Sequence, residues 1–331
     1  MQINDSAKYE KIFKKQIQIT EEKIQSVFTG IKPSSLYEPC AYIINGGGKR
    51  LRPFLVIISA KAAGSSFNKA RNAALAVELL HNFTLAHDDI MDNADKRRGR
   101  PTAHIKYDEN TAILAGDNLL AYAYKYLLND CKDNDKQVIS EITRGLIEVC
   151  EGQALDKEFE TRKDVSIEEY KVMIYKKTAA LAESCCAIGA LIAGADVKVK
   201  KALSSFGKNI GMAFQIQDDL LDISADEAEF GKMLGGDLME GKKTYLFLKA
   251  LEKAEGSDRV DLLKVIENKG IKKSEIKKYK KIYEKLGVFE DAQKEILEYT
   301  KKAISGLKVI SSIEDKNQLI WLANYLIKRS K

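Results

Sequence analysis

Residues that interrupt helices are scarce in this sequence. Only 4 of its 331 residues are proline and 21 are glycine, so few positions would break a long helix. Strict alternation of apolar and polar residues, which marks a half-buried strand, is also hard to find. Apolar residues instead recur at three- and four-residue spacing, which predicts an all-α protein. The expected helices cover residues 5–29, 35–45, 53–63, 68–92, 111–129, 136–160, 166–194, 199–223, 243–253, 258–267, 274–286, 288–304 and 315–328.

The sequence lacks the features of secreted, zinc-binding and membrane-spanning proteins. Its five cysteines are an odd number without a Cys-x-x-Cys pair, which argues against a disulfide framework and a zinc site. Residues 1–20 are interrupted by lysine and glutamate and contain no signal-peptide core. The most apolar tract, residues 178–195, contains Glu183 and many small residues, which is typical of a packed core helix. We therefore expect a soluble, cytoplasmic protein without stable membrane insertion.

Neither a large excess of one charge nor a linker is present. The formal net charge is +6, and many lysines in the C-terminal third alternate with glutamate and apolar residues. That pattern is typical of the solvated face of amphipathic helices, so we expect no nucleic-acid partner. No Pro-, Gly- or Ser-rich spacer divides the chain. We expect residues 1–331 to form a single domain, a bundle of α-helices around a central cavity.

Two copies of one acidic pattern, Asp-Asp-x-x-Asp, each stand at the end of an apolar helical run. With about 3.6 residues per turn, the first and last aspartates of each copy share a helix face, and the second lies on its flank. Like charges at this spacing cost about 0.2–0.5 kcal/mol per pair, and negative charge near a helix C-terminus opposes the helix dipole. A solvated face is the alternative, but the repetition favours a functional site. The first acidic cluster is Asp88, Asp89 and Asp92, and the second acidic cluster is Asp218, Asp219 and Asp222.

Basic residues gather at three other places. Three glycines, residues 46–48, precede the basic segment that leads to Pro53, the expected first helical residue. Backbone N–H groups and cations at such a helix start can bind an anion. A plain turn is the alternative, and the spacing of a nucleotide P-loop is missing. Carboxylates and cations together fit a diphosphate that arrives with Mg²⁺, which takes carboxylate and phosphate oxygens while arginine donates bidentate hydrogen bonds. The cations are Lys49, Arg50 and Arg52, then Arg97 and Arg98, then Lys177, Lys232, Lys242 and Lys243.

The segment from Gly46 to Thr244 resembles the trans-isoprenyl diphosphate synthases, or polyprenyl synthetases. The resemblance implies an isoprenoid-synthase-type bundle of α-helices around a deep cavity, usually a homodimer. It also implies a prenyltransferase that joins isopentenyl diphosphate to an allylic diphosphate with three Mg²⁺ ions. The family motifs that match in order are GGKRLRP, HDDIMD followed by RRGRPT, GQALD, KTAAL, FQIQDDLLD and GKMLGGDLMEGKKT.

Matched position by position, the resemblance implies a role for each cluster. The metal ligands would be Asp88 and Asp92 for two Mg²⁺ ions and Asp218 for a third, with Asp89, Asp219 and Asp222 completing or orienting the shell. The allylic diphosphate would be bound by Arg97, Lys177, Lys232 and Lys242, and isopentenyl diphosphate by Lys49, Arg52, His81 and Arg98. Oxygens facing the carbocation would come from Thr178 and Gln215, supported by Gln153 and Asp156. The expected catalytic residues are therefore Asp88, Asp92, Asp218, Arg97, Lys177, Thr178 and Gln215.

The implied mechanism rests on charge and on the exclusion of water. Metal ions and basic side chains would stabilise the leaving diphosphate, and isopentenyl diphosphate would attack the allylic cation. Phe83 and Thr84, shortly before Asp88, are candidates for the floor beneath the growing chain. Helix geometry puts Thr84 nearer the Asp88 face, so the role of Phe83 rests on the resemblance. A single aromatic there is typical of short-chain, twenty-carbon enzymes, so we expect geranylgeranyl diphosphate, with farnesyl diphosphate next. His87 is interpreted as an ordinary, partly buried histidine.

Two alternative functions remain. A terpene cyclase shares the first acidic cluster but normally replaces the second and lacks a segment like GGKRLRP. A non-catalytic regulatory subunit of a prenyl synthase tends to lose one cluster, whereas both are intact here. A di-iron helical bundle would need Glu-x-x-His ligands, which are absent. The sequence therefore favours a chain-elongating prenyltransferase.

Overall fold

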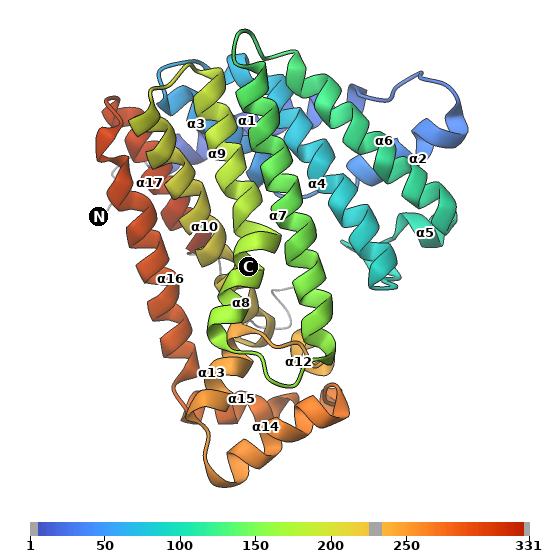
Figure 1. Ribbon diagram of the computed structural model, residues 1–331, viewed down its shortest axis with the longest axis vertical. Coiled ribbons are helices and arrows are strands. Elements are labelled where there is room, and N and C mark those ends of the chain that lie inside the picture. Colours follow the sequence, from blue (N-terminus) through green and yellow to red (C-terminus); the bar gives the residue numbers. More distant parts are fainter. Residues whose placement is uncertain (1–5, 225–233, 328–331) are drawn as a thin grey trace. The chain divides into compact units, whose positions relative to one another are not determined.

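The computed structural model describes residues 6–224 and 234–327 (Figure 1). This part of the chain is all-α apart from one short hairpin, which confirms the predicted fold class. None of its helices is long and apolar enough to cross a membrane. The longer helices are α1 (Ser6–Ser26), α2 (Ser34–Ile44), α3 (Leu51–Ala62), α4 (Arg71–Met91), α6 (Glu109–Leu128), α7 (Asp135–Thr161), α8 (Ile167–Ile174), α9 (Ala180–Ile192), α10 (Val197–Ser224), α13 (Tyr245–Lys253), α14 (Gly256–Asn268), α15 (Ile276–Lys285), α16 (Val288–Ser305) and α17 (Ile313–Ile327). The short elements are α5 (Ala103–Lys106), α12 (Gly236–Met239), and the strands β1 (Lys96–Arg97) and β2 (Arg100–Pro101).

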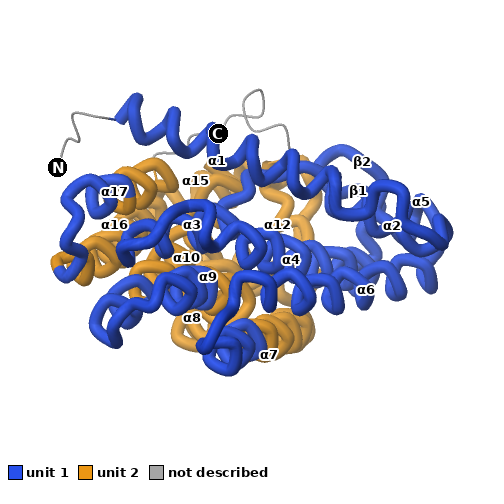
Figure 2. The backbone as a smooth tube through the Cα atoms, turned by 90° about the horizontal axis from the view of Figure 1, so that it is seen from above, with its two compact units in different colours: residues 1–143, 184–204, 309–318 blue, residues 144–183, 205–308, 319–331 orange. Residues whose placement is uncertain are grey.

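The chain divides into two compact units, which Figure 2 shows in different colours. The divisions between them fall inside the helices α7, α9, α10 and α17. The first acidic cluster belongs to unit 1 and the second to unit 2. Unit 1 comprises residues 1–143, 184–204 and 309–318, and unit 2 comprises residues 144–183, 205–308 and 319–331.

In unit 1, α4 lies alongside α6 over much of its length (Figure 1). The two helices approach closely because α6 turns small buried residues toward the core, among them Ala112, Ala115 and Gly116. Helix α3 also packs against α4, and its apolar residues from Phe54 to Ile58 are buried. These contacts hold α4 in place, and the C-terminal end of that helix carries the first acidic cluster.

In unit 2, α13 packs against α14, α15 and α16. One apolar cluster includes Phe247 of α13, Leu262 of α14 and Tyr283 of α15. The apolar face of α10 belongs to the same cluster through Met212 and Ile216. The second acidic cluster therefore stands on a helix that is held by this core.

Three details differ from the predicted helices. The single helix expected over residues 166–194 is two helices, α8 and α9, separated by a π-helix at Tyr175–Ala179. Helix α3 begins at Leu51, so Pro53 is its third residue and not its first. Proline is tolerated there because N–H groups of the first turn have no partner within the helix. The short elements α5, α12 and the β1–β2 hairpin were not expected.

Candidate functional site

The first acidic cluster lies where α4 ends. Asp88 and Asp89 belong to its last turn, and Asp92 caps the helix with its N–H 2.9 Å from the Asp88 carbonyl oxygen. Asp92 is exposed and Asp88 partly exposed, whereas Asp89 is buried. Oδ1 of Asp89 accepts a hydrogen bond of 2.7 Å from Arg97 Nε, and Arg97 Nη2 forms an ion pair with the same oxygen at 2.7 Å. Burial raises the pKa of Asp89, and the charge of Arg97 partly offsets that rise. Asp89 thus holds Arg97 in place, while Asp88 and Asp92 remain accessible to solvent.

The hairpin after α4 positions three arginines. Its two-residue turn has positive φ at Arg98 (53°) and Gly99 (76°), as in the turns that suit the twist of paired strands. Arg98 donates to the carbonyl of Gly47, and a Cβ added to Gly48 would lie 2.7 Å from the same Nη1. Arg100 donates to the Asn45 carbonyl at 2.7 Å. The Arg98 guanidinium therefore lies directly against the backbone of Gly47 and Gly48.

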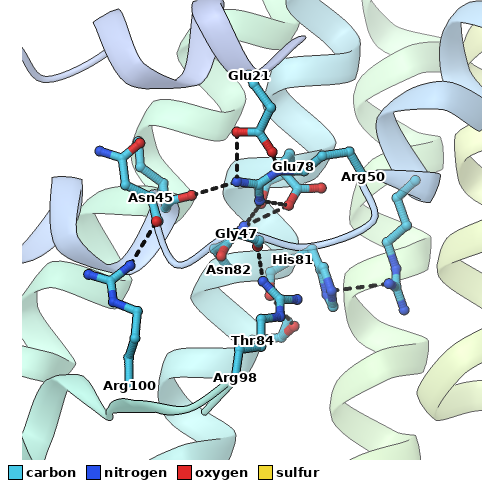
Figure 3. A network of polar contacts seen from close by, with 12 residues as sticks. Glu21, Asn45, Gly47, Arg50, Glu78, His81, Asn82, Thr84, Arg98 and Arg100 are labelled. Atoms are coloured by element: carbon cyan, nitrogen blue, oxygen red, sulfur yellow. Dashed lines mark hydrogen bonds and ion pairs between the residues drawn. The ribbon is translucent and has the colours of Figure 1, made fainter. Parts of the chain in front are cut away.

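Figure 3 shows a buried charge network around Arg50 beside these arginines. The Arg50 guanidinium donates to Glu78 at 2.6 Å, to Glu21 at 2.7 Å and to the Ile44 carbonyl at 2.9 Å. Arg50 is only 3% exposed and has a positive φ of 47°. Its neighbour Lys49 is exposed. Both residues are cations, but only Lys49 faces solvent, whereas Arg50 is buried and bonded within the protein.

Arg52 lies next to His81, which Figure 3 labels close to this network. Arg52 Nη1 is 3.0 Å from His81 Nε2. Because a guanidinium has no acceptor, Nε2 must carry a lone pair and Nδ1 the proton. Burial and the charges of Arg52 and other nearby arginines hold the pKa of His81 well below its usual range. His81 is therefore a neutral side chain in a cationic setting that suits an anion.

The second acidic cluster repeats the contrast between buried and exposed aspartates. Asp218 is exposed, whereas Asp219 is buried and accepts hydrogen bonds from the Tyr170 hydroxyl, the Tyr245 N–H at 3.1 Å and the Gln215 amide at 3.2 Å. Asp222 accepts from the N–H of Asp237 at 3.1 Å. Burial, and then the charge of Asp237, raises the pKa of Asp219 to about 7 and that of Asp222 to about 6. Both carboxyls therefore lie where further negative charge is unfavourable and a cation is favoured.

Sequence reasoning missed Asp237, which α12 places beside these aspartates. Its charge acts on Asp219, Asp222 and Lys242, whose Nζ is 3.8 Å from Asp237 Oδ1. Burial lowers the pKa of Lys242, but Asp237 and Glu240 reverse this and raise it overall. The motif GKMLGGDLMEGKKT contains Asp237, and its acidic residue could have been singled out there. Lys232 of the same motif lies outside the described residues.

The π-helix carries the next two expected ligands. Lys177 Nζ is 2.5 Å from Asp156 Oδ2, and the Thr178 hydroxyl donates to Gln215 Oε1 at 2.9 Å. Gln215 in turn donates to Asp219, so one hydrogen-bond chain joins the π-helix to the second acidic cluster. Gln153 is buried, and among the described residues its amide has no hydrogen-bond partner. A cavity of about 140 Å³ is lined by Asp156, Lys177, Thr178, Gln215, Asp219, Asp237 and Lys242, among others.

The two candidates for the chain-length floor lie on different faces of α4. The Thr84 hydroxyl donates to the His81 carbonyl at 2.8 Å within the helix. The ring of Phe83 packs edge-on against His87, with centroids 4.7 Å apart. His87 is partly buried and its ring lies over α6, so it points away from Asp88 as expected.

The donor set fits Mg²⁺ that is bound together with a phosphate. Among residues 6–224 and 234–327, no three or more His, Cys, Asp or Glu side chains are grouped to hold a metal ion. Mg²⁺ usually takes only one or two protein carboxylates and completes its shell with substrate phosphate oxygens and water. Unit 1 offers carboxylates of this kind at Asp88 and Asp92, and unit 2 offers one at Asp218, since none of the three is buried.

This chain is similar to enzymes that make isoprenyl diphosphates. The sequence profile described as polyprenyl synthetase matches residues 33–286. A geranylgeranyl diphosphate synthase from Sulfolobus acidocaldarius is 40% identical over 98% of this chain and 99% of its own length. The crystal structure of a geranylgeranyl pyrophosphate synthetase from Pyrococcus horikoshii is 37% identical with a TM-score of 0.91, covering 97% of this chain and 99% of that one. A polyprenyl synthase from Caulobacter crescentus, complexed with calcium and isoprenyl diphosphate, is 25% identical with a TM-score of 0.88, covering 98% of both chains.

Proposed function

The chain belongs to the polyprenyl synthetase family and is a trans-prenyl diphosphate synthase, and we propose that it makes geranylgeranyl diphosphate from isopentenyl diphosphate and allylic diphosphates. The observation that carries the proposal is the pair of intact Asp-Asp-x-x-Asp clusters in a chain that matches this family over most of its length. Geranylgeranyl diphosphate synthase is the commonest name among similar relatives. Farnesyl diphosphate is the next candidate product. The intact second cluster disfavours a terpene cyclase and a non-catalytic regulatory subunit.

Divalent metal ions are used by this family, and we assign three Mg²⁺ ions to this enzyme. Asp88 and Asp92 would bind two of them and Asp218 the third, because these carboxylates are accessible. The remaining aspartates would orient the site. Asp89 holds Arg97, and Asp219 is fixed by three hydrogen bonds. When bound, Mg²⁺ neutralises charge on the leaving diphosphate.

The basic residues divide between the two substrates in this proposal. Arg97, Lys177, Lys232 and Lys242 would bind the allylic diphosphate, whereas Lys49, Arg52, His81 and Arg98 would bind isopentenyl diphosphate. The neutral state of His81 and its contact with Arg52 support the second group, since Nδ1–H is left as a donor for a phosphate oxygen. The hydrogen bond from Arg98 to the Gly47 carbonyl also supports the second group, because it holds the Arg98 guanidinium beside the glycine run.

Catalysis would then follow from preorganised charge. Arg97 and Lys177 are held by Asp89 and Asp156, so they meet the developing negative charge of diphosphate without first having to be ordered. Thr178 and Gln215 would direct oxygens toward the allylic cation. The double bond of isopentenyl diphosphate attacks that cation, a carbon–carbon bond forms, and a proton leaves to the departing diphosphate. The apolar residues packed behind both clusters would exclude water that could quench the cation.

The test of the enzyme assignment is turnover by the purified protein. With Mg²⁺, isopentenyl diphosphate and allylic primers of five to fifteen carbons, we expect diphosphate release and a twenty-carbon prenyl diphosphate by mass. Asp88→Asn should lower kcat by about a hundredfold or more. Asp164→Asn, at an aspartate that is 93% exposed, is the matched control and should leave kcat unchanged. Absence of turnover with every primer would overturn the assignment.

Product length is tested at Phe83. If its ring bounds the growing chain, Phe83→Ala opens the floor, and the products should lengthen by at least one five-carbon unit. Thr84→Ala is the comparison, since its hydroxyl is already bonded within α4. The readout is the mass of the dephosphorylated products. An unchanged distribution for Phe83→Ala would remove Phe83 as the floor.

We also propose that the enzyme is a homodimer. Helix α6 leaves three apolar side chains exposed, Ile113 (38% accessible) and Leu114 (58%) near its start and Leu128 (46%) at its end. A second copy of the chain would cover them. Leu114→Glu should shift the mass measured by light scattering from twice the chain mass toward the chain mass. An unchanged mass would exclude this face of α6. The cytoplasmic location stays a prediction, supported by five free thiols.

A further inference from the structure

Phe83 does not stand alone on α4. Phe83 and His87 are four residues apart and share one face of the helix, which is a different face from that of Asp88. Their rings meet edge to face, with centroids 4.7 Å apart and planes inclined by 62°. Edge-to-face packing at this distance is a preferred arrangement of aromatic rings. The orientation of Phe83 therefore depends on where the His87 ring lies.

The His87 ring is seated on a glycine of α6. A Cβ added to Gly116 would lie 2.5 Å from His87 Nε2, 2.7 Å from His87 Cδ2 and 3.6 Å from Phe83 Cδ2. Any other residue at this position would force the imidazole to move. The same nitrogen lies 3.4 Å from the Ile113 carbonyl oxygen and 3.7 Å from Asp117 Oδ1. Helix α6 thus fixes the ring both by shape and by polar contacts.

We propose that His87, seated on Gly116, is a positioning residue that fixes the Phe83 ring and thereby narrows the range of product lengths. This inference rests on the proposed function, in which Phe83 bounds the growing chain. Phe83 stands five residues before Asp88, about 7.5 Å further along the helix axis. At that distance from Asp88, a change in the rotamer of Phe83 alters the space available to the growing prenyl chain. A phenylalanine without its ring partner has more rotamers available, and the product distribution broadens.

Two single variants and their combination test the proposal. His87→Ala removes the ring partner, and Gly116→Ala removes its seat. Since aromatic pairs change equilibria by about two- to tenfold, each variant should raise the fraction of products longer than the main wild-type product by about that factor. Total turnover should change less than the product ratio. The double variant should shift the ratio no further than either single variant, because both act through one ring.

Two further variants make the result interpretable. Ala121→Gly alters backbone freedom at an exposed position of α6 and should leave the product ratio unchanged. Phe83→Ala distinguishes the positioning role of His87 from the role of Phe83 as the floor beneath the growing chain. A longer product from Phe83→Ala with unchanged ratios for His87→Ala and Gly116→Ala would refute the positioning role alone. Unchanged products from Phe83→Ala would show that Phe83 does not bound the growing chain. Additive shifts in the double variant would show that His87 and Gly116 do not act through the same ring.

Discussion

At the residue scale, the site depends on charges that the fold pairs and charges that it exposes. Arg50 and Glu78 form a buried pair, with side chains that are 0% and 4% exposed. The same guanidinium also binds Glu21 of α1 and the carbonyl that ends α2. Arg50 therefore links α1, α2 and α4. These contacts fix the backbone of the segment that carries Lys49 and Arg52.

Removing Arg50 should destabilise the protein and removing Lys49 should not. Arg50→Met leaves Glu78 buried without its partner, and breaking a buried pair in this way costs about 3–5 kcal/mol. Lys49→Met is the matched control at an exposed neighbour. It should change the free energy of unfolding by less than about 0.5 kcal/mol while raising the KM for isopentenyl diphosphate. Urea unfolding and steady-state kinetics measure both quantities, and equal stability losses in the two variants would contradict this division.

His81 should make the folded protein sensitive to acid. Its pKa is held well below the usual value by burial and by neighbouring arginines. As the pH falls below about 6.5 the unfolded chain binds a proton at His81 that the folded chain does not, so stability falls by at most about 1.4 kcal/mol per pH unit. The raised pKa values of Asp219 and Asp222 act in the opposite direction, because stability they contribute when protonated is lost as the pH rises from about 4 to 7.

A variant isolates the histidine from those aspartates. His81→Gln cannot take up the proton, so the difference in unfolding free energy between wild type and variant should change between about pH 5 and pH 6.5 and be constant above that. Urea unfolding at a series of pH values provides the measurement. A difference that is constant over the whole range would show that His81 titrates normally in the fold.

At the element scale, the sequence predicted the long helices and missed what interrupts them. Periodic apolar residues are sufficient for α1, α4 and α10 because each buries one continuous face. The π-helix at Tyr175–Ala179 was not predicted from the apolar spacing, and its backbone at Lys177 lies directly against Gly152 of α7, a contact that the local sequence does not reveal. The hairpin could have been predicted, because Arg98-Gly99 places glycine in a turn that requires positive φ.

The contact between α7 and the π-helix can be tested at Gly152. A Cβ there would lie 2.2 Å from the backbone nitrogen of Lys177, so Gly152→Ala must displace the π-helix. Alanine would gain about 1 kcal/mol of helix propensity, but overpacking against backbone costs about 1–3 kcal/mol. We expect a net loss of stability and a higher KM for the allylic diphosphate, because Lys177 moves with the backbone. Ala154→Gly, at an exposed position of α7, is the control and should leave this KM unchanged.

At the scale of the whole molecule, sequence motifs identified the candidate ligands but not how each is held. The motifs give residue types at fixed spacing, so Asp88, Lys177 and Gln215 could be named from the sequence. The Tyr170 hydroxyl that fixes Asp219 comes from 49 residues away, and Asp237 enters through the short helix α12. Such contacts are made by tertiary packing, which no local pattern records. The assignment of metal and substrate to these residues stays a prediction for the kinetic tests above.

The predicted single domain can be tested by following both units during unfolding. The divisions between the units fall inside α7, α9, α10 and α17. Unfolding one unit alone would cut four helices in mid-length and leave backbone groups without partners at each new end. We therefore propose that the units unfold in one cooperative transition.

The chain carries a natural probe for each unit. Its one tryptophan, Trp321, is buried in unit 2, and the buried cysteines Cys40, Cys185 and Cys186 all lie in unit 1. Tryptophan fluorescence and the accessibility of these thiols to pulse labelling should change at the same urea concentration, because helix continuity links the two units. Two separated midpoints would instead show two domains that unfold independently. In that case the first and second acidic clusters would belong to separately folding parts, and the stability of one would be unaffected by variants such as Arg50→Met in the other.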